Sequence, residues 1–128
     1  MGSYQTIVLI YILFIWCVVL HTFEEISQGI FGLRIGPIKM NIRKYLLGAT
    51  LITTVNLGTL ALIVIGNKTG LYIGIFTSSA IGILQAFLHG IGYLIEGRKT
   101  KKLGAGFYSS IPLSFVGGAL LYHIIQVL

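Results

Sequence analysis

Four long hydrophobic segments, separated by short polar breaks, account for most of the chain. The hydrophobic segments cover residues 6 to 29, 42 to 65, 71 to 96 and 105 to 127. Glycines and polar residues fill the breaks, and Pro37 lies in the first of them. A helix needs about 20 apolar residues to cross the hydrocarbon core of a bilayer, and each segment reaches that length. The pattern therefore predicts an all-α polytopic membrane protein, in which residues 1 to 128 form a single four-transmembrane-helix bundle.

The composition agrees with this pattern. Hydrophobic residues make up 55% of the 128 residues and charged residues only 9%, whereas a typical soluble domain has about 25% charged residues. Four membrane spans use nearly the whole chain, so no room is left for a soluble domain. The class of soluble globular proteins is excluded on these grounds.

The basic residues are distributed unevenly between the two sides of the predicted bundle. Of the nine lysines and arginines, all but Lys68 fall in or beside the first and third loops: Arg34, Lys39, Arg43, Lys44, Arg98, Lys99, Lys101 and Lys102. Because positively charged loops stay in the cytoplasm, we expect both termini outside and these loops inside, in a bacterial plasma membrane. The segment from Arg98 to Lys102 is also expected to contact anionic membrane lipid. No nucleic-acid-binding module accompanies the basic residues, so nucleic acid is not expected as a partner.

Three ionisable residues lie inside the first hydrophobic segment, namely His21, Glu24 and Glu25. A charged group in hydrocarbon costs several kcal/mol unless it is paired, protonated or bound to a metal. Counted from the inner end of the segment, His21 lies about 12 Å deep and the two glutamates about 6 to 8 Å deep. The separations i, i+3 and i, i+4 place all three on one helical face. This face is the first candidate for a functional site.

The third hydrophobic segment carries a second polar stripe, formed by Gln85, His89 and Glu96, with Tyr93 in the same band. His89 also lies about 12 Å from the inner end of its segment, which is the depth expected for His21. Two polar stripes at one level of a bundle can face each other and form a site. We therefore expect His21 and His89 to meet, with Gln85 and Tyr93 in support.

The second and fourth segments contribute weaker candidates to the same site. Asn56, in the second segment, could reach its deeper end, and Ser110 and Ser114, in the fourth, could approach its shallow end. Serine hydroxyls often bond to the backbone of their own helix instead. Among these residues Asn56 is the strongest supporting candidate.

A metal-bound site is one interpretation of these residues. His21, His89 and either Glu24 or Glu25 would supply two histidines and one carboxylate, as in catalytic zinc or iron sites that keep a position open for water. A divalent metal there would activate water and polarise an ester, amide or phosphoryl group. The second glutamate would then be free to act as a general base.

A metal-free interpretation fits the same residues. Two neighbouring carboxylates in a buried site can divide into one proton donor and one proton acceptor, which suits isomerisation or proton transfer on a lipid. The spacing does not separate the two interpretations, because His-x-x-Glu-Glu is neither the His-Glu-x-x-His of zinc proteases nor the Glu-x-x-His of di-iron bundles. Both lead to a membrane enzyme that acts on a lipidic substrate near the inner leaflet.

The segment from His21 to Glu25 resembles the motif of a known family. A short four-span membrane protein with His-x-x-Glu-Glu near the end of its first helix is similar to the HXXEE-motif proteins, and the likeness covers nearly the whole chain. Members of that family are largely uncharacterised, and a later asparagine and histidine complete their polar pattern. The resemblance implies an enzymatic role, with Asn56 and His89 as candidates for the later pair and Gln85 as an alternative at the asparagine position.

Functions of other classes remain open at this point. The chain also resembles small multidrug exporters, four-helix proteins with a glutamate in the first span, which makes a proton-coupled transporter an alternative. A nonenzymatic subunit, or a homo-oligomer, would also give the polar cluster a partner. The glutamates could instead reach the basic first loop and pair with Arg34 or Arg43, and His89 could form a simple interhelical hydrogen bond.

Overall fold

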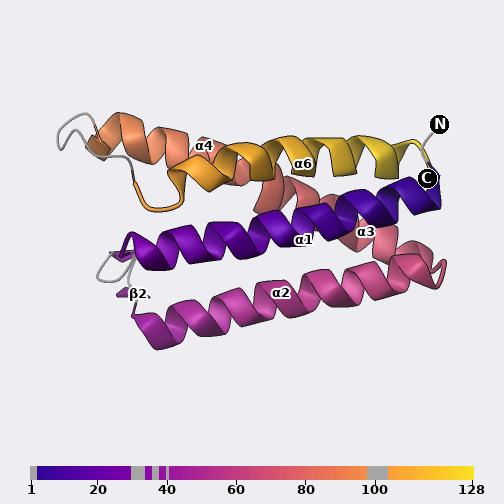
Figure 1. Cartoon of the computed structure of the whole chain (residues 1–128), viewed down its shortest axis with the longest axis horizontal. Coiled ribbons are helices and arrows are strands. Elements are labelled where there is room, and N and C mark those ends of the chain that lie inside the picture. Colours follow the sequence, from indigo (N-terminus) through magenta and orange to yellow (C-terminus); the bar gives the residue numbers. More distant parts are fainter. Residues whose placement is uncertain (1–2, 30–33, 36–37, 40, 98–103) are drawn as a thin grey trace.

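The computed structural model describes residues 3 to 29, 34 to 35, 38 to 39, 41 to 97 and 104 to 128 (Figure 1). Within these residues it contains four helices long and apolar enough to cross a membrane: Tyr4–Ser27, Ile42–Val64, Lys68–Ile95 and Phe107–Ile125. The prediction of an all-α four-helix membrane bundle is confirmed. The observed helices begin and end within a few residues of the segments expected from hydrophobicity.

Three of the four spans are simple helices, and the third is composite. The simple ones are α1 (Tyr4–Ser27), α2 (Ile42–Val64) and α6 (Phe107–Ile125). The third span consists of α3 (Lys68–Thr77), the π-helix η1 (Ser78–Ile83), α4 (Leu84–Gly92) and the π-helix η2 (Tyr93–Gly97). Two short strands, β1 (Arg34–Ile35) and β2 (Ile38–Lys39), pair antiparallel between α1 and α2.

Polar side chains mark the beginning of three helices. The Ser3 side chain accepts a hydrogen bond from the Thr6 N–H at the start of α1. The Asn41 and Asn67 side chains accept from the N–H groups of Lys44 and Thr69 at the starts of α2 and α3. Such caps satisfy N–H groups that have no partner within the helix. The start of α6 differs, because its capping position is occupied by Gly106, which has no side chain to offer.

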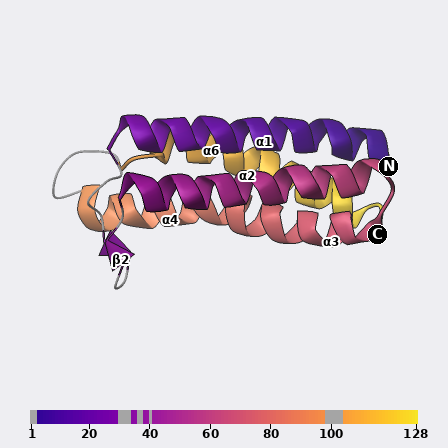
Figure 2. The ribbon, with the colours of Figure 1, turned by 90° about the horizontal axis from the view of Figure 1, so that it is seen from below.

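The third span runs obliquely across the bundle. In Figure 1, α1 lies between α2 and α6, and the third span begins beside α2 as α3 and ends beside α6 as α4. Viewed from the side of α2, α1 and the third span flank α2, and α6 lies partly behind them (Figure 2). We call the end that carries β2 the hairpin end and the end that carries both chain termini the terminal end. At the hairpin end α2 and α4 are therefore spread apart.

Large apolar side chains fill the terminal half of the bundle. Tyr11 and Phe14 of α1 are fully buried, as are side chains from each of the other spans: Ile63, Leu71, Leu120 and Ile124. The outward faces carry exposed apolar side chains such as Leu47 and Phe115, as expected of a surface in contact with lipid tails. This core also contains a buried polar contact, from the Tyr11 hydroxyl to Asn56 and Thr77.

A glycine pair lets the third span approach α6 closely. A Cβ atom at Gly117 would lie 2.9 Å from the Cα atom of Gly82 and 3.0 Å from the carbonyl oxygen of Ser78. Gly82 lies in η1, and the Ser114 hydroxyl donates a hydrogen bond of 3.0 Å to its carbonyl. A π-helix changes which backbone groups bond to each other, and the Ser114 hydroxyl gives the Gly82 carbonyl of η1 a partner from α6. Small residues and backbone contacts of this kind hold membrane helices together.

Candidate metal centre

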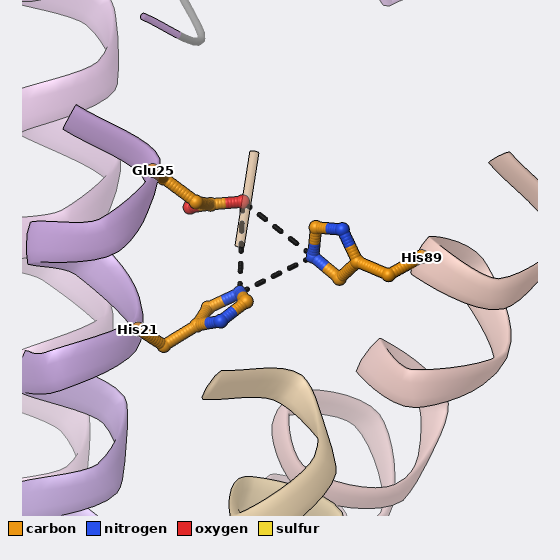
Figure 3. A group of neighbouring side chains, drawn as sticks. All are labelled: His21, Glu25 and His89. Atoms are coloured by element: carbon orange, nitrogen blue, oxygen red, sulfur yellow. Dashed lines mark hydrogen bonds and ion pairs between the residues drawn. The ribbon is translucent and has the colours of Figure 1, made fainter. Parts of the chain in front are cut away.

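Three side chains from two spans converge at the hairpin end (Figure 3). The Nε2 atoms of His21 and His89 lie 3.3 Å apart. The Oε1 atom of Glu25 lies 3.5 Å from the first of these nitrogens and 3.6 Å from the second. His21, Glu25 and His89 therefore form a group that could hold a metal ion. The expected meeting of His21 with His89 is observed.

The shape of this triangle matches one face of a tetrahedral site. Bonds of about 2.0 to 2.1 Å around a tetrahedral metal place neighbouring ligand atoms about 3.3 to 3.4 Å apart. The three measured separations, 3.3, 3.5 and 3.6 Å, lie at or just above that range. An octahedral centre with the same bond lengths would bring adjacent ligands to about 2.9 Å. The three atoms are therefore spaced so that they could surround one metal ion.

Helix geometry explains why these three residues meet. His21 and Glu25 are separated by one turn of α1 and point to the same side. His89 projects from α4, which packs against α6 next to α1. The side chains of His21, Glu25 and His89 are 8, 13 and 16% exposed, so the group is largely buried but still accessible.

Gly106 closes one side of the group. Its φ of +82° lies in the left-handed region that favours glycine. A Cβ atom at this position would lie 2.7 Å from Cγ of Glu25, 2.7 Å from Cε1 of His21 and 3.0 Å from Cε1 of His89. Both the backbone conformation and the close approach therefore require glycine, and the backbone before α6 forms a wall of the site.

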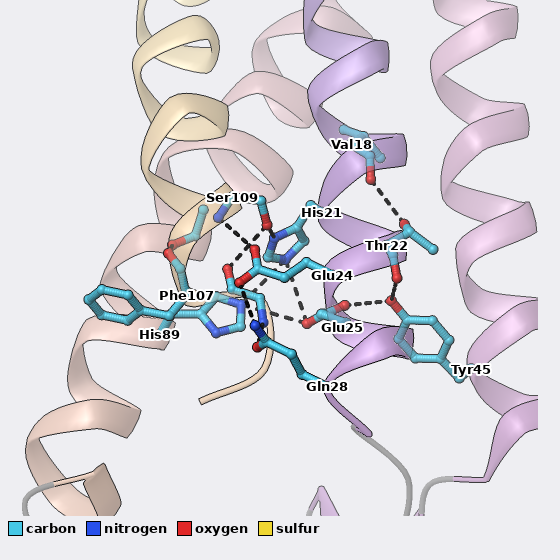
Figure 4. A network of polar contacts seen from close by, with 12 residues as sticks. Val18, His21, Thr22, Glu24, Glu25, Gln28, Tyr45, His89, Phe107 and Ser109 are labelled. Carbon is cyan, nitrogen blue, oxygen red and sulfur yellow. Dashed lines mark hydrogen bonds and ion pairs between the residues drawn. The ribbon is translucent and has the colours of Figure 1, made fainter. Parts of the chain in front are cut away.

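Ser109 fixes the orientation of the His21 ring. Its hydroxyl oxygen lies 2.8 Å from Nδ1 of His21 and 3.4 Å from the carbonyl oxygen of Gly106 (Figure 4). If Nδ1 carries the proton, it donates to Ser109, and Ser109 in turn donates to Gly106. That arrangement leaves Nε2 unprotonated and directed at the triangle, as a metal-ligating histidine requires.

Tyr45 holds the carboxylate of Glu25 in a similar way. Its hydroxyl donates a hydrogen bond of 2.5 Å to Oε2 of Glu25, while Oε1 faces the two histidines. One oxygen is thus anchored to α2 and the other remains available as a ligand.

Glu24 has a different position from the one expected of a ligand or general base. Its Oε2 accepts a hydrogen bond of 2.7 Å from the Ser109 N–H, and its Oε1 accepts one of 3.2 Å from the Tyr108 N–H. Gln28 donates to the same carboxylate and accepts from the Gly106 N–H. Glu24 therefore supplies, from α1, the N-terminal cap that Gly106 cannot give to α6.

The supporting residues expected from the sequence are divided between two places. Gln85 lines a cavity beside the metal-binding group, and the Tyr93 ring packs on the ring of Phe107, with 5.7 Å between centroids. Asn56 is fully buried elsewhere and accepts a hydrogen bond of 3.0 Å from the Tyr11 hydroxyl. Within the described part of the chain, Asn56 is not among the residues that line this cavity.

The two serines of α6 named from the sequence also serve the helices rather than the centre. Ser110 donates a hydrogen bond of 2.6 Å to the Phe107 carbonyl of its own helix, and Ser114 bonds to η1. The basic segment from Arg98 to Lys102, which was expected to contact anionic lipid, lies outside the described residues. Pro37 and the side chain of Glu96 also lie outside them.

Four contributors to the centre were not named as site residues from the sequence: Gln28, Tyr45, Gly106 and Ser109. Gln28 could have been found, because it follows Glu24 by one helical turn on the same face. The others come from different helices or from a loop, and their approach depends on how the spans pack. Local spacing carries no signal for such contacts.

A cavity opens beside the group, between α1, α2, α4 and α6. Its volume is about 460 Å³, within the range of about 300 to 1,000 Å³ that is common for small-molecule sites. His21, Glu25, Tyr45 and His89 lie at its polar end. The open side of the candidate centre can therefore receive a ligand of substantial size.

Comparison with known proteins adds no assignment to this geometry. No family model, no curated protein and no solved structure matches the chain. The resemblance to the HXXEE-motif family accordingly stays a prediction that rests on His21, Glu24 and Glu25.

Proposed function

We propose that this protein is a membrane-embedded, metal-dependent hydrolase that acts on a lipidic substrate. One observation carries the proposal: His21, Glu25 and His89 form a nearly equilateral triangle of ligand atoms at the polar end of a cavity inside a membrane bundle. Two histidines and one carboxylate with an open position are the ligand set of many catalytic zinc sites. The spacing favours zinc, with tetrahedral geometry, over the octahedral geometry of an iron site.

The residues around the centre have distinct parts in this proposal. His21, Glu25 and His89 bind the metal, and Ser109 and Tyr45 hold two of these ligands in their binding orientation. A metal in such a site supplies activated water at neutral pH and polarises a carbonyl or phosphoryl oxygen. In the overall reaction water adds across an ester bond, the bond between the acyl carbon and the alkoxy oxygen breaks, and an acid and an alcohol are released.

Contacts of the two glutamates speak against the metal-free acid/base interpretation. That interpretation needs Glu24 and Glu25 to divide a proton donor and an acceptor between them. The Glu24 carboxylate instead faces the N–H groups of α6, and the Glu25 carboxylate faces Tyr45 and the two histidines. The two carboxylates thus face different partners, which favours a metal over a carboxylate pair.

Packing of the terminal half favours an enzyme over a transporter. Tyr11, Phe14, Ile63 and Leu120 fill the bundle beyond the cavity and are at most 1% exposed. A transporter needs a binding site that reaches each side in turn. In this conformation the cavity and its polar end lie in one half of the bundle, as a site for chemistry within one leaflet would.

The proposal is tested by measuring the metal content of detergent-purified protein, without chelators and again after incubation with zinc, iron or manganese. We expect close to one metal per chain, with zinc bound most tightly. His21→Ala and His89→Ala should each lose the metal, because each variant keeps only two of the three ligands. His123→Ala is the matched control, since His123 lies near the far end of α6.

Two outcomes would contradict the proposal. One is wild-type protein that binds none of the three metals. The other is equal metal content in His21→Ala, His89→Ala and His123→Ala, which would place any bound metal elsewhere in the molecule.

A further inference from the structure

We infer that the cavity beside the metal centre holds the hydrocarbon chain of a single-chain anionic lipid, which enters sideways from the bilayer between α2 and α4. The width available to that chain is set by Gly48 on α2. This inference rests on the proposed function and specifies its substrate class. It draws on the part of the cavity that the metal-binding residues do not occupy.

The oblique course of the third span creates the entrance. α2 packs against α3 at the terminal end, whereas α4 packs against α6 at the hairpin end (Figure 1). Residues of both separated helices line the cavity, with Gly48 and Ile52 on α2 and Gln85 and Leu88 on α4. A space lined by two helices that diverge in this way faces the surrounding lipid, so the route into it is lateral.

The lining changes from polar to apolar along the bundle. Tyr45 and the metal-binding group lie at one end, and Ile52, Ile81 and Leu113 lie at the other. From Tyr45 to Ile52 the helix rises about 10 Å, which is most of the half-thickness of about 15 Å of a bilayer core. A lipid in the cavity would thus keep the direction of its neighbours in the leaflet, with its headgroup at the centre and its chain toward the midplane.

Charge at the mouth favours an anionic headgroup. Lys44 lines the polar end of the cavity next to Tyr45, and the proposed metal adds positive charge at the same level. A carboxylate or phosphate headgroup would be attracted by both. The occupant expected from this combination is a lipid with one acyl chain, because the cavity of about 460 Å³ has its polar side chains at one end.

Gly48 is a cavity-lining position at which a larger side chain would project into open space. It lines the cavity, yet a Cβ atom added to it would meet no atom within 4 Å. The missing side chain therefore leaves open space and is not required by helix packing. Gly58, on the same helix, also has nothing within 4 Å of an added Cβ atom, and it is exposed on the outer surface.

The test uses palmitic acid with a diazirine in the middle of its chain, incorporated into phosphatidylcholine vesicles that contain the protein. After irradiation, mass spectrometry identifies the labelled residues. We expect labels on Ile52 and Ile81 in wild-type protein, and unmodified palmitate should compete for them. Labels on the lipid-facing residues Phe76 and Phe115 are the internal standard for folded, inserted protein.

Substitutions at the two glycines then separate cavity binding from general lipid contact. Gly48→Leu should reduce cavity labelling about tenfold, the loss that corresponds to about two buried methylene groups. Gly48→Ala should give a smaller reduction, and Gly58→Leu should give none. Cavity labelling that is unchanged in Gly48→Leu, or labels spread equally over cavity and lipid-facing residues in wild-type protein, would overturn the inference.

The metal content of the labelled wild-type protein distinguishes this inference from the proposed function. Competable cavity labels in wild-type protein that binds none of the three metals would leave the chain-binding site standing while the proposed function fails. Stoichiometric metal together with no competable cavity label would refute the chain-binding site and leave the metal centre intact.

Discussion

Each candidate ligand on α1 is held by a side chain from another helix. Ser109 of α6 contacts the ring nitrogen of His21 that faces away from the triangle, and Tyr45 of α2 contacts the oxygen of Glu25 that faces away from it. Partners of this kind select the tautomer of an imidazole and the binding mode of a carboxylate. Two helices, α6 and α2, thus determine the direction of two candidate ligands that lie on a third helix, α1.

Ser109→Ala and Tyr45→Phe should therefore weaken metal binding without removing it. Loss of such an outer contact typically lowers metal affinity about 10- to 100-fold. Competition with a chelator of known affinity measures the change. Ser110→Ala is the matched control, because Ser110 bonds only to the carbonyl of Phe107 among the contacts described for it. Equal affinity in all four proteins would show that the orienting contacts are not needed.

At the scale of the helices, Glu24 joins the end of α1 to the start of α6. Its carboxylate accepts from two N–H groups in the first turn of α6, where the positive end of the helix dipole favours a negative charge. Gly106 is required beside the metal-binding group and cannot provide a cap of its own. Glu24 and Gly106 therefore have complementary functions at one helix terminus.

Glu24→Ala should destabilise the bundle by about 1 kcal/mol, the usual effect of losing an N-terminal cap. The expected result is a lower midpoint of thermal unfolding in detergent, with one metal per chain still bound at saturating metal. Glu24→Gln keeps an acceptor oxygen but no charge, so its midpoint of thermal unfolding should lie between those of wild-type protein and Glu24→Ala. Loss of the metal in Glu24→Ala without any change in unfolding would instead indicate that Glu24 is a ligand.

The helices and the site differ in how far the sequence specifies them. Long apolar segments predict the spans because chain length and hydrophobicity decide whether a helix crosses a membrane. The pairing of His21 with His89 followed from equal depth, which is also a local property of each helix. The contacts of Tyr45 and Ser109 depend on the rotation and crossing of neighbouring helices, and the capping role of Glu24 depends on a glycine 82 positions later. Sequence spacing contains no information on either.

At the scale of the whole molecule, charge and the candidate centre lie at the same end. Arg34 and Lys39 belong to the short strands at the hairpin end, whereas Lys68 begins α3 at the other end. Positively charged loops favour the cytoplasmic side. We accordingly propose that the metal centre lies in the inner half of the membrane and that the termini are outside.

Single-cysteine variants test this orientation. Cys17 is the only cysteine in the chain and is buried, so Cys17→Ala provides a background without reactive thiols. In that background, Ser3→Cys should react with a membrane-impermeant maleimide on intact cells, and Gly104→Cys only after permeabilisation. The reverse pattern would place the centre in the outer leaflet.

The position of Gly106 against all three candidate ligands has a consequence for assembly. His89 lies 68 positions after His21, and Ser109 lies 88 positions after it. During synthesis the first span is made before the third supplies His89 and before the fourth supplies the orienting hydroxyl of Ser109. A chain without α6 cannot contain the complete candidate centre. A metal bound there would stabilise only the finished bundle, so metal loading would report that insertion of the chain is complete.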